Sequence, residues 1–135
     1  MLKTKGILHV QLRTVLAKVG HKGKIAVVDA GYNVPLGVEV VDLAFMPNIP
    51  TMLQVLDGIL EELAVEEVYV SEKIKVNAPD LNQQYVERFN EKTKINYVTT
   101  EDFRKNLGEV KAIIRTGGYG LHSPNIILQG GCTYD

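Results

Sequence analysis

The sequence has few of the residues that build disulfides and metal centres. Its 135 residues include one cysteine, Cys132, and three histidines. A single cysteine excludes an internal disulfide and a cysteine-based zinc cluster, and it is typical of proteins from a reducing compartment. The histidines lie far apart in the sequence, without the spacing of metal ligands, so we expect no metal site and no cofactor of that kind.

The sequence also lacks an excess of charge of either sign. Fifteen basic and sixteen acidic residues give a formal net charge of −1, and like charges form no block. The composition therefore lacks the electrostatic footprint of a protein that binds nucleic acid or a membrane surface. We expect a partner that is small and uncharged. The glutamate pairs at 61–62 and 66–67 are interpreted as solvated faces.

Long apolar runs are absent as well. No stretch approaches the roughly 18 apolar residues that cross a bilayer. The N-terminal segment carries basic side chains, but His9 and Gln11 interrupt its apolar run, which argues against a secretory signal. From the sequence we expect a soluble protein of the cytoplasm.

The residues that are present predict one folded unit. Hydrophobic residues make up 45% of the chain and charged residues 23%, so residues 1–135 can bury a core as a single domain. Gly20 is predicted to end the first helix in a left-handed conformation, and Thr51 with Gln54 resembles a capping box. Apolar residues recur at helical spacing over the segments 8–19, 52–63, 81–89 and 103–107.

Short runs rich in β-branched residues alternate with these helices. They predict strands over residues 25–28, 38–45, 67–71, 95–98, 110–114 and 125–128. Because strands that alternate with helices indicate an α/β fold, we predict a largely parallel sheet with helices on both faces, in a Rossmann-like layering.

The first predicted strand is flanked by two residues suited to proton transfer. His21 stands in a turn between Gly20 and Lys22, and a histidine can give and take a proton near neutral pH. Asp29 follows the strand directly, beside a glycine turn, where open α/β sheets usually bind ligands. The alternatives are an inert surface histidine and an aspartate that only caps a helix or forms a turn.

A glycine-rich loop over residues 115–125 separates the last two strands. Its glycines let a ligand approach the backbone closely, but they match no phosphate-binding fingerprint, so a nucleotide is not expected. A loop of about ten residues is longer than most connections, which favours a function over a plain surface loop. Donors and acceptors that suit hydroxyl groups come from Tyr119, His122, Ser123 and Asn125.

Several short segments together resemble the D-ribose pyranase and L-fucose mutarotase family, over nearly the whole chain. The most specific part is the order and spacing of Gly20-His21, Asp29-Ala30-Gly31, Arg115-Thr116-Gly117 and Asn125-Ile126-Ile127-Leu128. Each fragment is weak alone. Further matches lie at Lys5-Gly6-Ile7-Leu8, Pro35, Val41-Asp42-Leu43 and Gln129.

The resemblance implies an α/β isomerase that interconverts the ring forms, pyranose and furanose or anomers, of a free monosaccharide such as ribose or fucose. It implies that no cofactor is needed, and that the chain forms a homo-oligomer, commonly a decameric ring, with the site near a subunit boundary. By the same resemblance His21 is the acid/base catalyst, and Asp29 and Asn125 bind the sugar. We add His122 and Ser123 as sugar-binding candidates.

The chain departs from the pyranase members of this family at three positions. Thr100 stands where those members carry a second histidine, Gly118 where they carry a glutamate, and Ser123 where they carry a tyrosine. The loop is one residue longer, and His122 is a candidate to occupy the space that the missing side chains leave. Two alternatives remain open: a non-catalytic sugar-binding or regulatory module on the same scaffold, and a purely structural ring-forming subunit.

Overall fold

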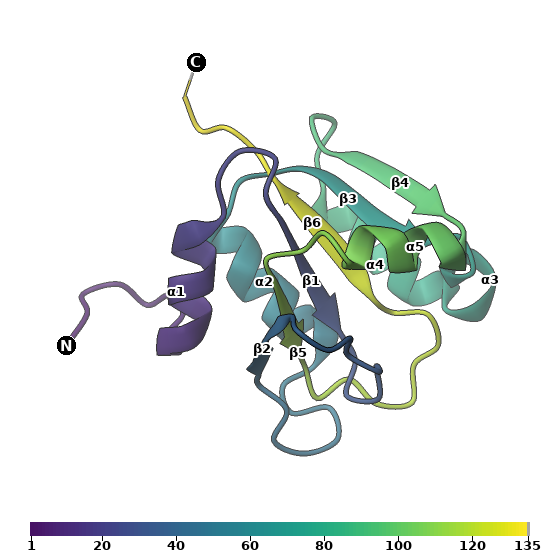
Figure 1. The fold of residues 1–135 in the computed structure, drawn as a ribbon, viewed down its shortest axis with the longest axis horizontal. Coiled ribbons are helices and arrows are strands. Elements are labelled where there is room, and N and C mark those ends of the chain that lie inside the picture. The colour runs from purple at the N-terminus through teal and green to yellow at the C-terminus, as the bar shows by residue number, and fades with distance from the viewer. Residues whose placement is uncertain (135) are drawn as a thin grey trace.

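The strands form one six-stranded sheet in the computed structural model, which describes residues 1–134 (Figure 1). Their order across the sheet is β2-β5-β1-β6-β3-β4. In chain order the strands are β1 (Lys24–Val28), β2 (Glu39–Asp42), β3 (Val65–Ser71), β4 (Lys94–Val98), β5 (Ala112–Arg115) and β6 (Ile126–Gly130).

One strand runs against all the others. Strand β6 pairs antiparallel with β1 on one side and with β3 on the other, whereas the remaining neighbours pair in parallel. The predicted largely parallel sheet is therefore confirmed. The loop before β6 consequently lies at the same edge of the sheet as the carboxyl ends of the five other strands.

Helices cover the two faces of the sheet unequally (Figure 1). The first four helices contribute to the cluster on one face, and the last packs on the opposite face. They are α1 (Val10–Lys18), α2 (Met52–Glu62), α3 (Ile74–Asn77), α4 (Pro79–Arg88) and α5 (Thr100–Leu107). Within residues 1–134, no helix combines the length and the apolar character that a membrane crossing requires.

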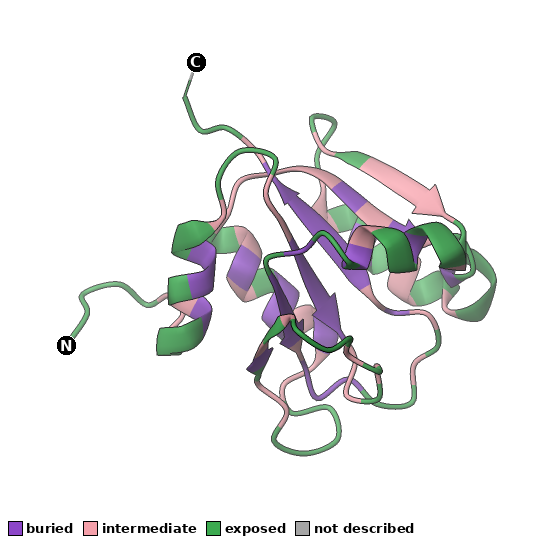
Figure 2. Ribbon diagram, in the orientation of Figure 1, coloured by how far each residue is buried: buried purple, intermediate pink, exposed green. Residues whose placement is uncertain are grey.

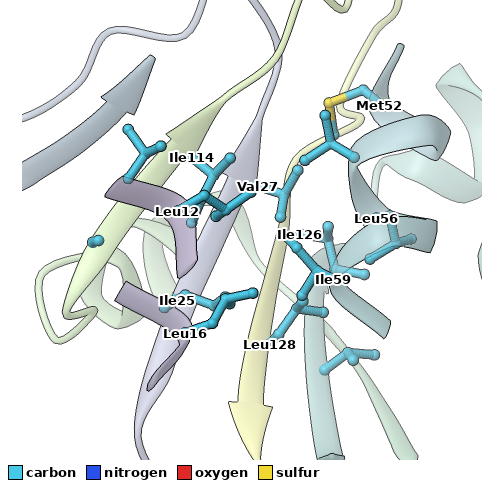
Figure 3. Close-up of a cluster of buried hydrophobic side chains, with 14 of the residues drawn as sticks. Leu12, Leu16, Ile25, Val27, Met52, Leu56, Ile59, Ile114, Ile126 and Leu128 are labelled. Carbon is cyan, nitrogen blue, oxygen red and sulfur yellow. The ribbon is translucent and has the colours of Figure 1, made fainter. Parts of the chain in front are cut away.

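The core explains why β1 reads as a continuous apolar run. Ile25 and Val27 point into the cluster beneath α1 and α2, where Figure 3 shows them beside leucine and isoleucine side chains of both helices. Ala26 and Val28 point to the other face, against residues of α5. A strand covered on both faces has no solvent-exposed side. Figure 2 shows β6 buried along its length, β1 buried after its first residue, and the edge strand β4 only partly covered.

The ends of the helices follow the sequence only in part. The capping box of α2 is confirmed, because Thr51 and Gln54 each accept a hydrogen bond from the other's backbone amide. The left-handed stop at Gly20 is wrong: α1 ends at Lys18, its C-cap Val19 is extended, and the positive φ of 73° lies at Lys22. The imidazole of His9, which no pattern singled out as a cap, accepts the amide of Leu12 at the start of α1.

The segment between β3 and β4 holds more helix than expected. Residues 74–77, which no predicted helix covers, form the short helix α3. Helix α4 then begins at Pro79, with Ala78 as its N-cap, so that Asp80 lies in the first turn and does not cap the helix. Proline at the first helical position needs no hydrogen-bonded amide, which explains the early start.

Candidate functional site

A pocket opens at the edge of the sheet where five strands end. Asp29 follows β1, Ser71 ends β3, and Thr100 lies just beyond β4. Because β6 is antiparallel to its neighbours, Asn125, the residue just before this strand, lies at the same edge. The carboxyl ends of strands in an open α/β sheet are the usual ligand site, so the topology places these side chains where a small molecule binds.

The pocket has the size of a small-molecule site. Its volume is about 640 Å³, within the range of ligand cavities. The wall comes from the loops after β1 and before β6 and from the ends of β3, β4 and α5. It comprises Asp29, Gly31, Tyr32, Asn33, Pro35, Ser71, Thr100, Phe103, Arg104, Leu107, Leu121, His122, Ser123, Pro124 and Asn125.

The polar centre of this wall is the pair Asp29 and Asn125. The backbone amide of Asp29 donates to Oδ1 of Asn125 at 2.9 Å, which leaves the Asn125 NH₂ group as a donor for a ligand. Burial raises the pKa of the half-buried Asp29 carboxyl, and backbone amide contacts at Asp29 and Tyr32 oppose the shift. An acceptor beside a donor matches the hydroxyl groups of a polyol.

The start of the glycine-rich loop is fixed against the end of β1. The hydroxyl of Thr116 donates to the carbonyl of Val28 at 2.9 Å and accepts the amide of Gly118 at 3.0 Å. The Gly118 carbonyl in turn accepts the amide of Ala30 at 2.9 Å. A Cβ at Gly118 would lie 2.9 Å from Cγ of Met52, so this position has no room for the glutamate of the family's pyranase members without a shift of the neighbours.

The other end of the loop is held by α3 and α4. The buried hydroxyl of Tyr85 donates to the carbonyl of Pro124, and Nδ2 of Asn77 donates to the Ser123 hydroxyl at 3.2 Å. Ser123 has a φ of 55°, in the left-handed region. These contacts present Ser123 and the exposed His122 at the rim of the pocket.

His21 lies away from this pocket. It precedes β1, whereas Asp29 follows it, and a five-residue strand at about 3.3 Å per residue separates the two by roughly 16 Å. The structure thus brings together Asp29, Asn125, His122 and Ser123, and within one chain it does not bring His21 to them. The catalytic role of His21 stays a prediction.

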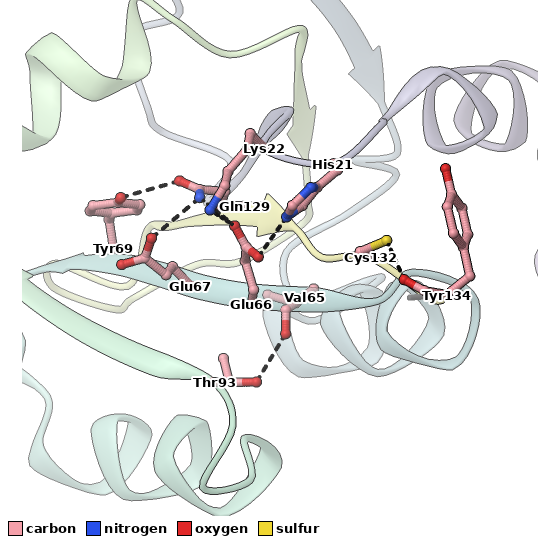
Figure 4. A network of polar contacts seen from close by, with 10 residues as sticks. All are labelled: His21, Lys22, Val65, Glu66, Glu67, Tyr69, Thr93, Gln129, Cys132 and Tyr134. Atoms are coloured by element: carbon pink, nitrogen blue, oxygen red, sulfur yellow. Dashed lines mark hydrogen bonds and ion pairs between the residues drawn. The ribbon is translucent and has the colours of Figure 1, made fainter.

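At its own edge of the sheet, His21 belongs to a second polar cluster (Figure 4). Its Nε2 lies 3.0 Å from Oε2 of Glu66, and Lys22 contacts the other carboxylate oxygen at 2.6 Å. The interpretation of the pair at 66–67 as a solvated face is wrong, because both side chains are half-buried and both contact Gln129. The pair at 61–62 is exposed as predicted.

Sequence reasoning missed several residues of the pocket wall. Tyr32 lies only three positions after Asp29, in the loop between the first two predicted strands, so its place in the pocket wall could have been predicted. Burial raises the pKa of the Tyr32 hydroxyl, and the positive charge of Arg104 opposes the shift. Phe103 and Arg104 were assigned only to a helix, since nothing in the sequence says that α5 covers this edge.

The described part of the chain offers no metal centre. Residues 1–134 contain no group of three or more histidine, cysteine, aspartate or glutamate side chains that could hold an ion. The polar side chains of the two clusters can donate and accept hydrogen bonds.

Comparison with known proteins decides the family. The model of the RbsD / FucU transport protein family matches residues 2–133. The chain belongs to this family. A D-ribose pyranase from Lactiplantibacillus plantarum is 39% identical to it over 134 residues, which cover 99% of this chain and 100% of that relative. This chain therefore matches that pyranase along its full length.

Solved structures of RbsD / FucU proteins agree with the fold. The structure of Bacillus subtilis RbsD complexed with D-ribose has a TM-score of 0.92 at 35% identity, covering 98% of this chain and 100% of that one. Fucose mutarotase from Streptococcus pneumoniae, in complex with L-fucose, has a TM-score of 0.74 at 21% identity and covers 94% and 95% of the two chains. The second likeness supports the fold alone.

Proposed function

We propose that this chain is a cofactor-independent isomerase that interconverts the ring forms of a free monosaccharide such as ribose or fucose. The observation that carries the proposal is the full-length match to D-ribose pyranases. The pocket at the carboxyl ends of the strands supports it, because a half-buried carboxylate and an amide donor stand side by side in a cavity of suitable size.

Ring opening needs little from the protein beyond binding and proton transfer. The bond between the anomeric carbon and the ring oxygen breaks, the anomeric hydroxyl loses its proton as a carbonyl forms, and the ring oxygen gains a proton. Closure through another hydroxyl, or on the other face, gives the product. Positioned acid/base groups supply about 10²- to 10⁴-fold in such steps.

Each candidate residue takes one part in this scheme. Asp29 accepts a hydrogen bond from a sugar hydroxyl, and the NH₂ group of Asn125 donates one. His122 and Ser123 bind the sugar at the rim of the pocket. His21 moves the proton, and it does so in the pocket of a second copy of the chain, because in its own chain it lies at the opposite edge of the sheet.

A homo-oligomer follows from this arrangement. We propose that the copies form a ring, as a decamer, in the cytoplasm. Exposed apolar side chains in residues 45–49, which follow β2, and in the glycine-rich loop support an interface close to the pocket. The two segments are joined by hydrogen bonds between Asn48 and Tyr119. The exposed residues are Phe45, Met46, Ile49 and Tyr119.

The direct test is exchange spectroscopy by NMR on ribose and fucose. Wild-type protein is expected to speed pyranose-to-furanose or anomer exchange above the buffer rate, and His21→Ala is expected to lose about 10²-fold or more of that gain. Asp29→Asn should raise the KM more than it lowers kcat. A wild-type rate equal to that of buffer would contradict an isomerase.

One feature of the pocket favours a second candidate, a non-catalytic sugar-binding or regulatory module. Thr100 lines the cavity, and its hydroxyl does not titrate near neutral pH as a histidine would. Calorimetry separates the two functions, because a binding module takes up sugar without faster ring exchange. A purely structural subunit would show neither.

A further inference from the structure

The cluster around His21 lies outside the pocket, and nothing assigns a role to its carboxylate. Glu66, at the start of β3, makes three contacts through its two oxygens (Figure 4). Oε2 lies 3.0 Å from Nε2 of His21, while Oε1 accepts Lys22 at 2.6 Å and Nε2 of Gln129 at 2.8 Å. The imidazole is thus held by a carboxylate that is itself held from two sides.

The two holders of Glu66 differ in rigidity. Lys22 is an exposed side chain, whereas Gln129 lies in β6 and is only 5% exposed. The Tyr69 hydroxyl donates to the Gln129 carbonyl oxygen at 3.2 Å, which fixes the amide so that its NH₂ group faces Glu66 and, at 3.3 Å, Glu67. The position of the carboxylate is therefore set by the central strand of the sheet.

The charge of Glu66 decides which imidazole nitrogen carries the proton. Hydrogen bonds from Lys22, Gln129 and His21 lower the pKa of the Glu66 carboxyl to about 2, so at neutral pH it is ionised. An ionised carboxylate only accepts hydrogen bonds. Nε2 of His21 must then be the donor, and in the neutral ring the lone pair is on Nδ1.

We propose that Glu66 is the positioning residue for His21: its carboxylate holds the Nε2–H of the ring and leaves Nδ1 as the atom that exchanges protons with the sugar. This rests on the proposed function for the identity of the substrate. No hydrogen bond within residues 1–134 engages Nδ1, and 49% of the His21 side chain is exposed, so a ligand held by another copy can reach it.

The proton balance of ring opening fits one nitrogen. Nδ1 accepts the proton of the anomeric hydroxyl as the carbonyl forms, and the electron pair of the broken bond stays on the ring oxygen. That oxygen then takes the proton back from Nδ1. Between the two steps the imidazole is a cation with both nitrogens protonated, and its Nε2–H keeps the contact with Glu66.

The first test reads the tautomer directly and needs no sugar. Nitrogen NMR of ¹⁵N-histidine-labelled protein, at a pH where imidazole is neutral, is expected to show His21 protonated at Nε2 alone. Glu66→Ala should shift the signal toward a mixture of both tautomers. A ring protonated mainly at Nδ1 in the wild type, or identical spectra for Glu66→Ala and the wild type, would overturn the inference.

The second test separates positioning from binding. Glu66→Gln is expected to lower kcat for ring exchange at least about tenfold while KM changes less than about twofold, because Glu66 orients the proton-transfer group and does not touch the sugar. Lys22→Met, which changes only an exposed side chain, should give a smaller loss in the same direction. Glu67→Gln is the matched control, since Glu67 contacts Gln129 but not His21.

The two proposals fail separately. Equal kcat values for Glu66→Gln and Glu67→Gln would contradict the role of Glu66 even if the enzyme is active. An inactive wild type would contradict the isomerase, while the tautomer of His21 would still confirm or refute the geometry at Glu66.

Discussion

At the scale of single residues, the pairing of Glu66 links function to acid stability. Its folded-state pKa of about 2 lies below the ordinary value of 4.5, chiefly because Lys22 and Gln129 donate to it. A carboxyl with a depressed folded-state pKa stabilises the fold above its unfolded pKa. That contribution is lost as the pH falls from 4.5 towards 2, because the unfolded chain then binds the proton first.

Glu66→Gln should therefore flatten the acid side of the stability curve. Between about pH 5 and pH 3, the wild type is expected to lose more free energy of unfolding than this variant, as measured by urea denaturation at each pH. Glu67→Gln is expected to keep the wild-type slope. If the two variants lose stability in parallel with the wild type, the pairing seen in Figure 4 does not persist in solution.

Single residues also show how much of the candidate site could be predicted from the sequence. Asp29 was predictable because it follows a buried strand directly, and the pocket lies there. Asn125 and Ser123 came from a loop whose length and glycines stood out. Glu66 was not predictable, since its partner His21 comes from a distant loop and its holder Gln129 comes from the reversed strand β6.

At the scale of elements, strand β1 both presents and separates the two main candidates. A residue before a strand and a residue after it lie at opposite edges of the sheet, so the predicted strand alone already excludes contact between His21 and Asp29 in one chain. Most helices and strands were predictable from the spacing of apolar residues, but the short helix α3 was not. The reversal of β6 was not, because an apolar run covered on both faces carries no mark of its direction.

Helix α4 positions the pocket loop through one hydroxyl. Tyr85→Phe removes the donor to the Pro124 carbonyl and leaves that buried acceptor unsatisfied. We expect a loss of about 1–3 kcal/mol in the free energy of unfolding and weaker sugar binding. Urea denaturation and calorimetry measure the two effects. Tyr97→Phe is the control, because the Tyr97 hydroxyl donates to Asn82 of α4 and not to the glycine-rich loop. Unchanged sugar affinity in Tyr85→Phe would contradict the positioning of the loop by α4.

At the scale of the whole molecule, the separation of the two polar edges makes activity depend on assembly. If His21 of one copy serves the Asp29 pocket of another, then at sugar concentrations below KM His21→Ala is slow through its kcat and Asp29→Asn through its KM, but equal amounts of the two complement one another. In randomly mixed oligomers about one quarter of the sites contain both wild-type side chains.

The expected rate of such mixed oligomers, prepared by joint refolding or co-expression, is therefore about one quarter of the wild-type rate by exchange NMR. Mixing the purified proteins without subunit exchange provides the control. If the mixed oligomers are as inactive as either parent, His21 does not act across a subunit boundary. Light scattering on the same samples gives the size of the assembly.

The reversed strand also limits where the length of this chain can change. Asn125 bonds to Asp29 just before β6, and Gln129 holds Glu66 near its end, so the same short strand sets the spacing of both polar sites. A one-residue insertion between Ile126 and Leu128 would turn the later side chains of β6 to the opposite face, so the contact at Asp29 and the contact at Glu66 could not both form. Insertions upstream, in the glycine-rich loop, would instead change the entrance of the pocket for a different ligand and leave the spacing of Asn125 and Gln129 unchanged.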